Sequence, residues 1–176
     1  AVSGADLPVP CAAGTCGIGS PEVFVTSGQA TYSVAGSVGT VEQLSDRAIL
    51  NWQQFNVASG AKVVFKQPRD ISVALNRIYD QSPSQILGAV TANGQVYLVN
   101  PNGMIFGANA RVNVNTLIAS SLDIPESVFN GPGLAGAINQ GGGVAALSAA
   151  TGPRGDIDVA HGAVLETVDG GRIFIF

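Results

Sequence analysis

Residues 95–106 read QVYLVNPNGMIF, two short apolar runs on either side of the corner Asn100-Pro101-Asn102-Gly103. Asn and Gly tolerate left-handed backbone conformations, and Pro101 fixes φ at its place in the corner. Asn side chains at such a corner can also satisfy backbone groups. The stretch therefore predicts a β-turn between two short strands, Val96–Val99 and Met104–Phe106.

Short β-type runs punctuated by Gly or Asn recur along the rest of the chain. Short strands joined by tight corners indicate an all-β fold, because Gly and Asn supply the positive φ that such corners need. Only single helical turns are expected, at Ser84–Leu87 after Pro83 and at Pro125–Phe129, since Pro suits the start of a helix. The predicted strands are Ala48–Trp52, Lys62–Phe65, Ser72–Leu75, Gln95–Val99, Met104–Phe106, Arg111–Val114 and Leu117–Ala119.

The C-terminal third repeats this pattern with a glycine before each run. The intervals are too short for strand–helix–strand units, and they suit a coil in which three short strands make one turn. Successive turns of such a coil stack about 4.8 Å apart. Spacing alone leaves a β-sandwich open as the alternative. The repeating runs are Gly136–Asn139, Gly143–Leu147, Gly155–Val159, Gly162–Leu165 and Gly171–Ile175.

The composition indicates one sizeable domain with a buried core, because the 176 residues are 46% hydrophobic and only 11% charged. The formal net charge is -4 and the only lysines are Lys62 and Lys66, so there is no basic stripe for nucleic acid. The longest apolar runs, such as 143–150, fall short of the roughly 20 residues of a membrane-spanning helix. We therefore expect neither nucleic acid binding nor membrane insertion.

Both ends of the sequence suggest a piece of a longer chain. The only methionine is Met104, so Ala1 is not a translation start, and the first residues lack the features of a signal peptide. The last residues, Arg172–Phe176, read as a strand that stops without a turn and leaves an aromatic edge. We expect the natural chain to continue beyond Phe176.

The two cysteines, Cys11 and Cys16, lie close together in a Gly- and Pro-rich segment. We favour a local disulfide, which would indicate an oxidising compartment. Metal binding is disfavoured because two thiols and the distant His161 do not supply four ligands, and redox motifs more often have two intervening residues. Two unpaired thiols remain the alternative.

Four segments in this order resemble the secretion domain of two-partner secretion exoproteins of the filamentous-haemagglutinin type. They are NWQQFN at 51–56, VALNRI at 73–78, PSQILG at 83–88 and ANGQVYLVNPNGMIFG at 92–107. The resemblance continues through 117–124 and covers nearly all of the chain from about residue 29. Two departures are the missing second motif, Asn-Pro-Asn-Leu, and the cysteine pair, which is not part of the pattern.

The resemblance implies a right-handed parallel β-helix with an N-terminal β cap and short extra-helical strands. It implies one secretion domain over 1–176, with 1–28 a flexible or cap-leading segment and 29–176 the capped β-helix. Such a domain is the address that the POTRA domains of a dedicated outer-membrane β-barrel transporter, TpsB, read in the periplasm of a Gram-negative bacterium. Its folding at the cell surface is thought to seed the β-helix downstream. The expected protein is monomeric and secreted or held at the surface.

Several residues are candidate site residues. The Asn100-Pro101-Asn102-Gly103 motif is a turn that holds neighbouring coils in register and, secondarily, a surface read by the transporter. In the motif Asn51, Trp52 and Phe55, we expect Trp52 in the core or cap and Asn51 bonded to backbone.

Three further C-terminal residues spell the integrin-binding tripeptide, Arg154-Gly155-Asp156, which we interpret first as an ordinary turn and only secondly as an adhesion site. Asp156 and Asp158 faintly resemble a calcium-binding β-roll, but the repeated nonapeptide is missing. His161 is interpreted as a turn residue.

The function favoured by the sequence is a non-enzymatic secretion module without metal or cofactor. Parallel β-helices also host polysaccharide-degrading enzymes, but the acidic residues here are scattered and form no convergent pair. A surface adhesin that binds glycan or a host receptor directly is the other alternative, and one Trp and three Tyr offer it little stacking surface. We expect partner binding by edge pairing of strands and apolar contacts.

Overall fold

The computed structural model describes residues 7–130 and 154–176, and these residues form a β-solenoid of about three turns. Parallel pairing between coils excludes the β-sandwich alternative, in which strands pair antiparallel. The elements are β1 (Val9–Pro10), β2 (Val25–Ser27), β3 (Ala30–Ala35), β4 (Val38–Gln43), β5 (Arg47–Gln54), β6 (Lys62–Lys66), β7 (Val73–Ile78), β8 (Ser84–Ile86), β9 (Ala89–Ala92), β10 (Gln95–Val99), β11 (Met104–Phe106), β12 (Arg111–Val114), β13 (Thr116–Ser120), α1 (Glu126–Asn130), β14 (Ile157–Val159), β15 (Val164–Thr167) and β16 (Ile173–Ile175).

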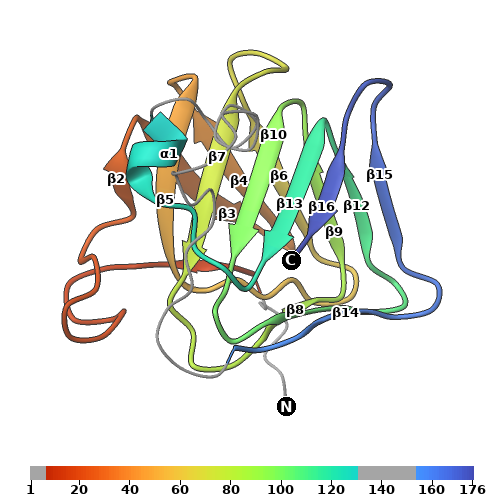
Figure 1. Ribbon diagram of the computed structural model, residues 1–176, viewed down its shortest axis with the longest axis horizontal. Coiled ribbons are helices and arrows are strands. Elements are labelled where there is room, and N and C mark those ends of the chain that lie inside the picture. The colour runs from red at the N-terminus through yellow and green to blue at the C-terminus, as the bar shows by residue number, and fades with distance from the viewer. Residues whose placement is uncertain (1–6, 131–153) are drawn as a thin grey trace, which may run out of the picture.

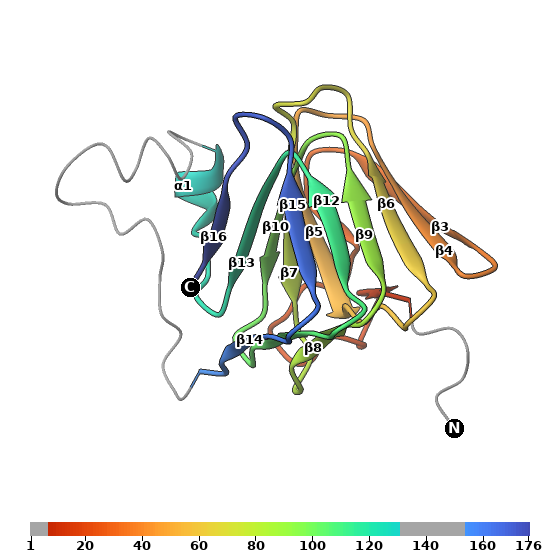
Figure 2. The ribbon, with the colours of Figure 1, turned by 90° about the vertical axis from the view of Figure 1, so that its right-hand side faces the viewer.

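Three sheets form the faces of the solenoid (Figure 1). We call them sheet A (β1-β5-β7-β10-β13-β16, with β2 also on β5), sheet B (β15-β12-β9-β6-β4-β3) and sheet C (β14-β11-β8). The chain visits sheets B, A and C in turn, so that β6, β7 and β8 make one coil and β9, β10 and β11 the next. Figure 2 shows the β3–β4 hairpin at one end of the solenoid and β16 at the other.

The parallel register places like residues above one another in successive coils. In sheet A, Ala74 pairs with Val96 and Val96 with Leu117, and all three lie in the main core. Their neighbours Tyr97 and Ile118 point outward, because successive side chains of a strand face opposite sides. The inward positions therefore form continuous apolar rows, which explains the high hydrophobic content of the chain.

An N-terminal cap closes one end of the solenoid. β1 and β2 pair antiparallel with β5, and β3 pairs antiparallel with β4. Within the cap the ring of Trp52 lies edge-on to Tyr32 at 4.9 Å, Phe24 at 4.9 Å and Phe55 at 5.3 Å between ring centroids. The cap thus begins before residue 29, and the described part of the segment expected to be flexible or cap-leading contributes two of its strands.

The outer face of sheet A is covered by the segment that contains α1 (Figure 1). Val128 and Phe129 of α1 pack with the outward residues of four sheet A strands. Two arginines hold the segment by its backbone: Arg47 Nη1 donates to the Phe129 carbonyl at 2.9 Å, and Arg77 Nη2 donates to that of Ile124 at 2.8 Å. An apolar sheet face that would otherwise be exposed is thereby buried.

Most sequence-based elements are confirmed. Predicted runs match β5, β6, β7 and β10 to β13, with Gln95–Val99, Met104–Phe106 and Arg111–Val114 identical in their bounds, and the turn at Pro125–Phe129 is α1. The helical turn predicted at Ser84–Leu87 is wrong, because Ser84–Ile86 is β8 and pairs parallel with β11. Of the repeating runs, Gly136–Asn139 and Gly143–Leu147 lie outside the described residues.

Candidate recognition corner and cap

The motif Asn100–Gly103 forms a hydrogen-bonded turn between β10 and β11. The N–H of Gly103 donates to the Asn100 carbonyl at 2.9 Å, and the N–H of Asn102 donates to Asn100 Oδ1 at 2.9 Å. Gly103 has φ +97°, which only glycine adopts without strain. The chemistry of the corner is therefore that of an Asx turn inside a β-turn, as its residue types predict.

The side chain of Asn100 is fully buried and ties neighbouring coils together. Its Nδ2 donates to the Ser82 carbonyl at 3.2 Å and to Ser84 Oγ at 3.0 Å in the preceding coil. Its backbone N–H donates to the Ser120 carbonyl at 3.0 Å in the following coil. Through its side chain and its backbone N–H, Asn100 thus joins three coils at one point, and a shorter or apolar side chain would leave the Ser82 carbonyl and Ser84 Oγ without this partner.

Pro101 and Asn102 are the more accessible residues of the motif, and each is half-buried, whereas Asn100 and Gly103 are buried. Asn102 Nδ2 donates to the Asp80 carbonyl at 2.6 Å. Pro101 borders a surface pocket of about 230 Å³ between the corner and the α1 segment. The pocket is lined by Arg77, Ile78, Tyr79, Val99, Pro101 and Asp123.

The tripeptide Arg154-Gly155-Asp156 stacks on this motif as the corner of the next coil. Gly155 N–H donates to the Pro101 carbonyl at 2.9 Å, and the Asp156 carbonyl accepts from Met104 N–H at 3.1 Å. A Cβ on Gly155 would lie 1.9 Å from the Asn102 carbonyl oxygen, so glycine is required there for packing. The backbone of the tripeptide is held on both sides of Gly155, while the side chains of Arg154 and Asp156 are exposed.

The cap motif brings Asn51 and Trp52 together with backbone from distant segments. Asn51 is fully buried, and its Nδ2 donates to the Val23 carbonyl at 3.3 Å. Trp52 is also fully buried, and its indole Nε1 donates to Asn76 Oδ1 at 2.9 Å. Asn76 in turn donates to the Tyr97 carbonyl at 3.1 Å, so that this buried chain of bonds links three sheet A strands. Both expectations, a core tryptophan and a backbone-bonded asparagine, match this geometry.

Cys11 and Cys16 are joined by a disulfide with a Cα–Cα distance of 5.6 Å. Both sulfur-bearing residues are buried, and the Cys11 N–H donates to the Asn51 carbonyl at 3.0 Å. The disulfide therefore fixes a small loop directly against the cap strand β5. Beyond the loop, Ile18 is fully exposed.

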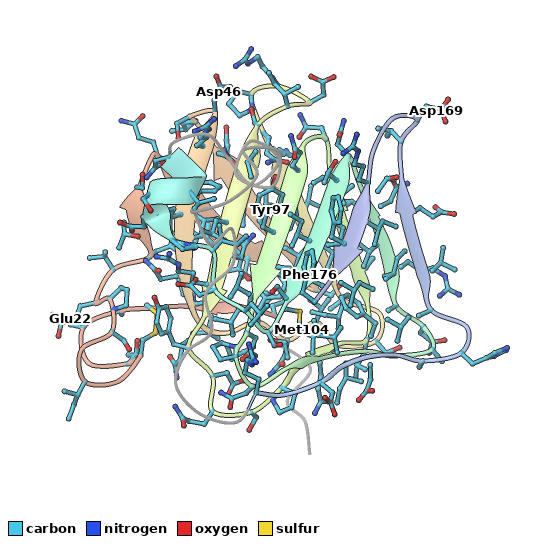
Figure 3. All side chains as sticks on the ribbon, viewed as in Figure 1. Glu22, Asp46, Tyr97, Met104, Asp169 and Phe176 are labelled. Atoms are coloured by element: carbon cyan, nitrogen blue, oxygen red, sulfur yellow. A yellow bond between two sulfur atoms is a disulfide. The ribbon has the colours of Figure 1, made fainter. Side chains whose placement is uncertain are left out.

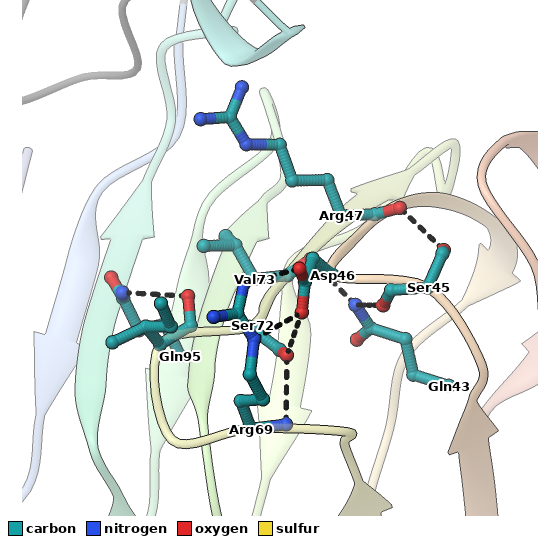
Figure 4. Close-up of polar contacts among 9 residues, drawn as sticks. Gln43, Ser45, Asp46, Arg47, Arg69, Ser72, Val73 and Gln95 are labelled. Carbon is teal, nitrogen blue, oxygen red and sulfur yellow. Dashed lines mark hydrogen bonds and ion pairs between the residues drawn. The ribbon is translucent and has the colours of Figure 1, made fainter.

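A polar cluster between the coils was not predicted from the sequence (Figure 4). Arg69 Nε donates to Asp46 Oδ1 at 2.9 Å and its Nη2 donates to Oδ2, while Ser72 Oγ donates to Oδ1 at 3.1 Å. The Arg69 hydrogen bond, with a smaller contribution from Ser72, holds the pKa of Asp46 below its ordinary value of 3.8. The ion pair between Arg69 and Asp46 is about half exposed, so it adds little to the stability of the fold, and its main effect is to order the loops that carry these two residues.

The other acidic residues and His161 are dispersed over the described part of the chain. The labelled acids Glu22, Asp46 and Asp169 lie at separate places on the molecule (Figure 3). Within 7–130 and 154–176, no group of three His, Cys, Asp or Glu residues is arranged to hold a metal ion. His161 and Asp158 are exposed near β14. In the same part of the chain, no helix has the length and apolar character needed to span a membrane.

A capped β-solenoid whose coils are held by an Asn-Pro-Asn-Gly corner is the architecture that the sequence resemblance implies. The TPS secretion domain family model matches residues 20–164 of the chain. The chain belongs to this family, and it is the secretion domain of an exported protein of two-partner secretion.

Two relatives are both named heme/hemopexin-binding protein, from Haemophilus influenzae. One, from strain Rd, is 40% identical over 109 residues, which is 62% of this chain and 12% of that protein. The other is 44% identical over 85 residues, which is 48% of this chain and 9% of that protein. The chain thus spans about a tenth of the length of these relatives.

A solved structure gives the same architecture. The crystal structure of the HMW1 secretion domain from Haemophilus influenzae superimposes with a TM-score of 0.58 at 39% sequence identity. The similar region covers 60% of this chain and 28% of that one.

Proposed function

We propose that this domain is the export address of a longer secreted protein and is bound in the periplasm by the POTRA domains of its TpsB outer-membrane transporter. The observation that carries the proposal is the family match over 20–164, which includes the cap strands β2 to β4 and the Asn100–Gly103 corner. In this proposal the domain has no catalytic role and carries the protein to the medium or the surface of a Gram-negative bacterium.

In the described residues, the N-terminal end of the solenoid carries antiparallel cap strands and the C-terminal end does not, which supports a role in starting the fold of a longer β-helix. β1 and β2 cover β5, whereas β14, β15 and β16 are each the last strand of a sheet. At the open end Ile173, Ile175 and Phe176 are 39%, 43% and 41% exposed. A further coil would bury these side chains and pair the edges of β14, β15 and β16 that carry no strand among the described residues.

We propose that the whole of 1–176 acts as one secretion domain, in which the Asn100–Gly103 motif works first as a structural corner. Asn100 is fully buried and bonded to neighbouring coils, so its side chain is not accessible to a transporter, whereas Pro101 and Asn102 are partly accessible. Asn100→Ala is therefore expected to lower the melting temperature and secretion together. An Asn102→Ala variant that keeps its melting temperature and loses secretion would instead assign a direct recognition role to the motif.

Heme or hemopexin binding, which the names of the two relatives state, is proposed for the longer protein rather than for this domain. The chain has a single histidine, His161, which is exposed, and its only methionine, Met104, is fully buried. The region that resembles this chain is 12% and 9% of the two relatives, so most of each relative lies outside the part that matches this domain.

Direct binding tests the proposal. The purified 176-residue chain is titrated against the POTRA domains of the transporter encoded beside its gene, with the POTRA domains of an unrelated two-partner system as the control. The proposal predicts saturable binding to the cognate domains and at least about tenfold weaker binding to the control. No binding, or equal binding to both, contradicts it.

A further inference from the structure

Among the described residues, the longest strand with an open edge at the N-terminal end of the solenoid is β3. In sheet A the edge of β5 is covered by β1 and β2, and in sheet C Ile86 of β8 forms a bridge to Val57. Sheet B ends on β3, which among the described residues pairs only with β4. β3 is therefore the longest strand at this end whose second edge carries no strand in the described part of the chain. β1 and β2 also pair on one side only, but they have two and three residues and an irregular register.

The sequence of β3 has none of the devices that usually protect a sheet edge. Its six residues, ATYSVA, include no charge and no proline, and they favour extended backbone. Charged side chains, prolines and bulges are the usual means by which an edge is kept from pairing with another strand. An uncharged edge of this length is a competent template for an added strand.

The register identifies which backbone groups face the open edge. The Leu44 N–H donates to the Gln29 carbonyl at 2.8 Å, so Gln29 turns its backbone groups toward β4. Backbone direction alternates along an antiparallel strand, so Thr31 and Ser33 also face β4. Ala30, Tyr32 and Val34 consequently present their N–H and C=O groups to the open edge.

The edge is held rigid by the side chain of Tyr32. Its ring lies edge-on to Trp52 at 4.9 Å and tilted against Phe24 at 6.2 Å, inside the cap. Next to it along the same face Val34 is 53% exposed, while Thr31 and Ser33 lie exposed on the opposite face. A strand added here would meet apolar surface on one face and small polar side chains on the other.

We propose that β3 is the docking strand for the transporter, and that its open edge pairs with an extended segment of a POTRA domain that has apolar residues at alternate positions. The proposal rests on the proposed function, since it assigns the site at which that partner is bound. The added strand forms backbone hydrogen bonds with Ala30, Tyr32 and Val34 and covers the exposed side chain of Val34. The polar face of the added strand lies beside Thr31 and Ser33.

Hydrogen exchange of the wild-type chain with and without the cognate POTRA domains tests the pairing. The amide protons of Ala30, Tyr32 and Val34 are expected to exchange at least about tenfold more slowly in the complex. Those of Thr31 and Ser33, already bonded to β4, are the internal reference. A complex that forms with no added protection at the three edge amides overturns the docking site and leaves the proposed function standing.

A pair of variants at one position gives a second measurement. Val34→Pro removes an edge-facing N–H at a place where an edge strand tolerates proline, and Val34→Thr keeps the N–H and the side-chain volume. We expect binding about tenfold weaker for Val34→Pro and within about twofold of wild type for Val34→Thr. Equal binding by the two folded variants overturns the proposal, and hydrogen exchange of the wild type decides the question if Val34→Pro does not fold.

Two further outcomes distinguish a failure of the β3 docking site from a failure of the proposed function. If the wild-type chain does not bind the POTRA domains at all, the proposed function fails and the docking site fails with it. If the edge amides become protected when the chain alone is concentrated, the edge pairs with a second copy and the transporter assignment is overturned.

Discussion

The backbone N–H of Gly155 donates a hydrogen bond to the carbonyl oxygen of Pro101 at an N···O distance of 2.9 Å. This bond stacks the corner of one coil directly on the Asn100–Gly103 corner of the coil before it. The contact is close, because the carbonyl oxygen of Asn102 lies 1.9 Å from where a Cβ of residue 155 would be. The Asn100–Gly103 motif is therefore held in place by its contact with Gly155 as well as by the hydrogen bonds of its own turn.

Gly155→Ala is expected to destabilise the fold by about 2 kcal/mol or more, because the new methyl group meets backbone that cannot move without breaking the stacked corners. Urea unfolding measures the change. Gly60→Ala is the control, since Gly60 has φ +85° with open space around its Cβ position and should lose only about 1 kcal/mol. A Gly155→Ala variant as stable as wild type would show that the corners are not packed as described.

The bond between Trp52 and Asn76 is expected to couple the cap to the first full coil. Asn76→Ala leaves the buried Trp52 N–H and the Tyr97 carbonyl without this partner and should cost about 3 kcal/mol. In a double-mutant cycle with Trp52→Phe, the two changes should be non-additive by about 1 kcal/mol. Strict additivity would indicate that the indole and the amide do not interact.

Tyr32→Phe is expected to be neutral or stabilising at pH 7, because the buried Tyr32 hydroxyl has no hydrogen-bond partner among the described residues. Burial raises the pKa of Tyr32 from 10.0 to about 12. The unfolded chain ionises first, so the stability linked to this group is complete below pH 10 and is lost as the pH rises toward 12.

Melting temperatures of wild type and Tyr32→Phe across the alkaline range check this sign. The variant should lose less stability than wild type between pH 10 and pH 12, and Tyr79 and Tyr97, present in both proteins, cancel in the comparison. A variant that loses as much as wild type would show that Tyr32 ionises in the folded cap as easily as in the unfolded chain.

Replacing both cysteines by serine is expected to lower stability by about 2 kcal/mol, the loop-entropy value for so short a loop. The effect should be confined to the cap, because the disulfide lies against β5. Thermal unfolding with and without reductant measures it, and reductant should not affect the double variant. A wild-type protein insensitive to reductant under conditions that free both thiols would contradict a stabilising role.

The sequence predicts those parts of the fold that local chemistry controls. The strand Gln95–Val99 is predicted with its observed bounds because Asn-Gly corners flank it, and α1 is predicted because Pro125 directly precedes its first residue, Glu126. The three residues of β8 carry too little pattern to be told from a helical turn. Their state is decided by pairing with Met104–Phe106 in the next coil, which no local signal reveals.

Site residues, too, are predictable where local residue type decides their role and not where contacts between coils decide it. Asn100 and Gly103 are predictable as turn residues, and Trp52 as a core residue, from residue type alone. The partners Asn76, Ser84 and Gly155 are not, because each contact joins different coils and depends on their register. The same holds for Asp46 and Arg69, two exposed charges whose pairing becomes visible only once the coils are stacked.

Transporter-dependent export is the most direct test of the account. The 176-residue chain is expressed behind a signal peptide with and without the transporter encoded beside its gene, and folded protein is measured in the medium by its protease resistance. Release only in the presence of the transporter is the predicted result. Release without the transporter, or a folded product retained in the periplasm in its presence, would contradict the assignment and indicate a self-contained binding domain.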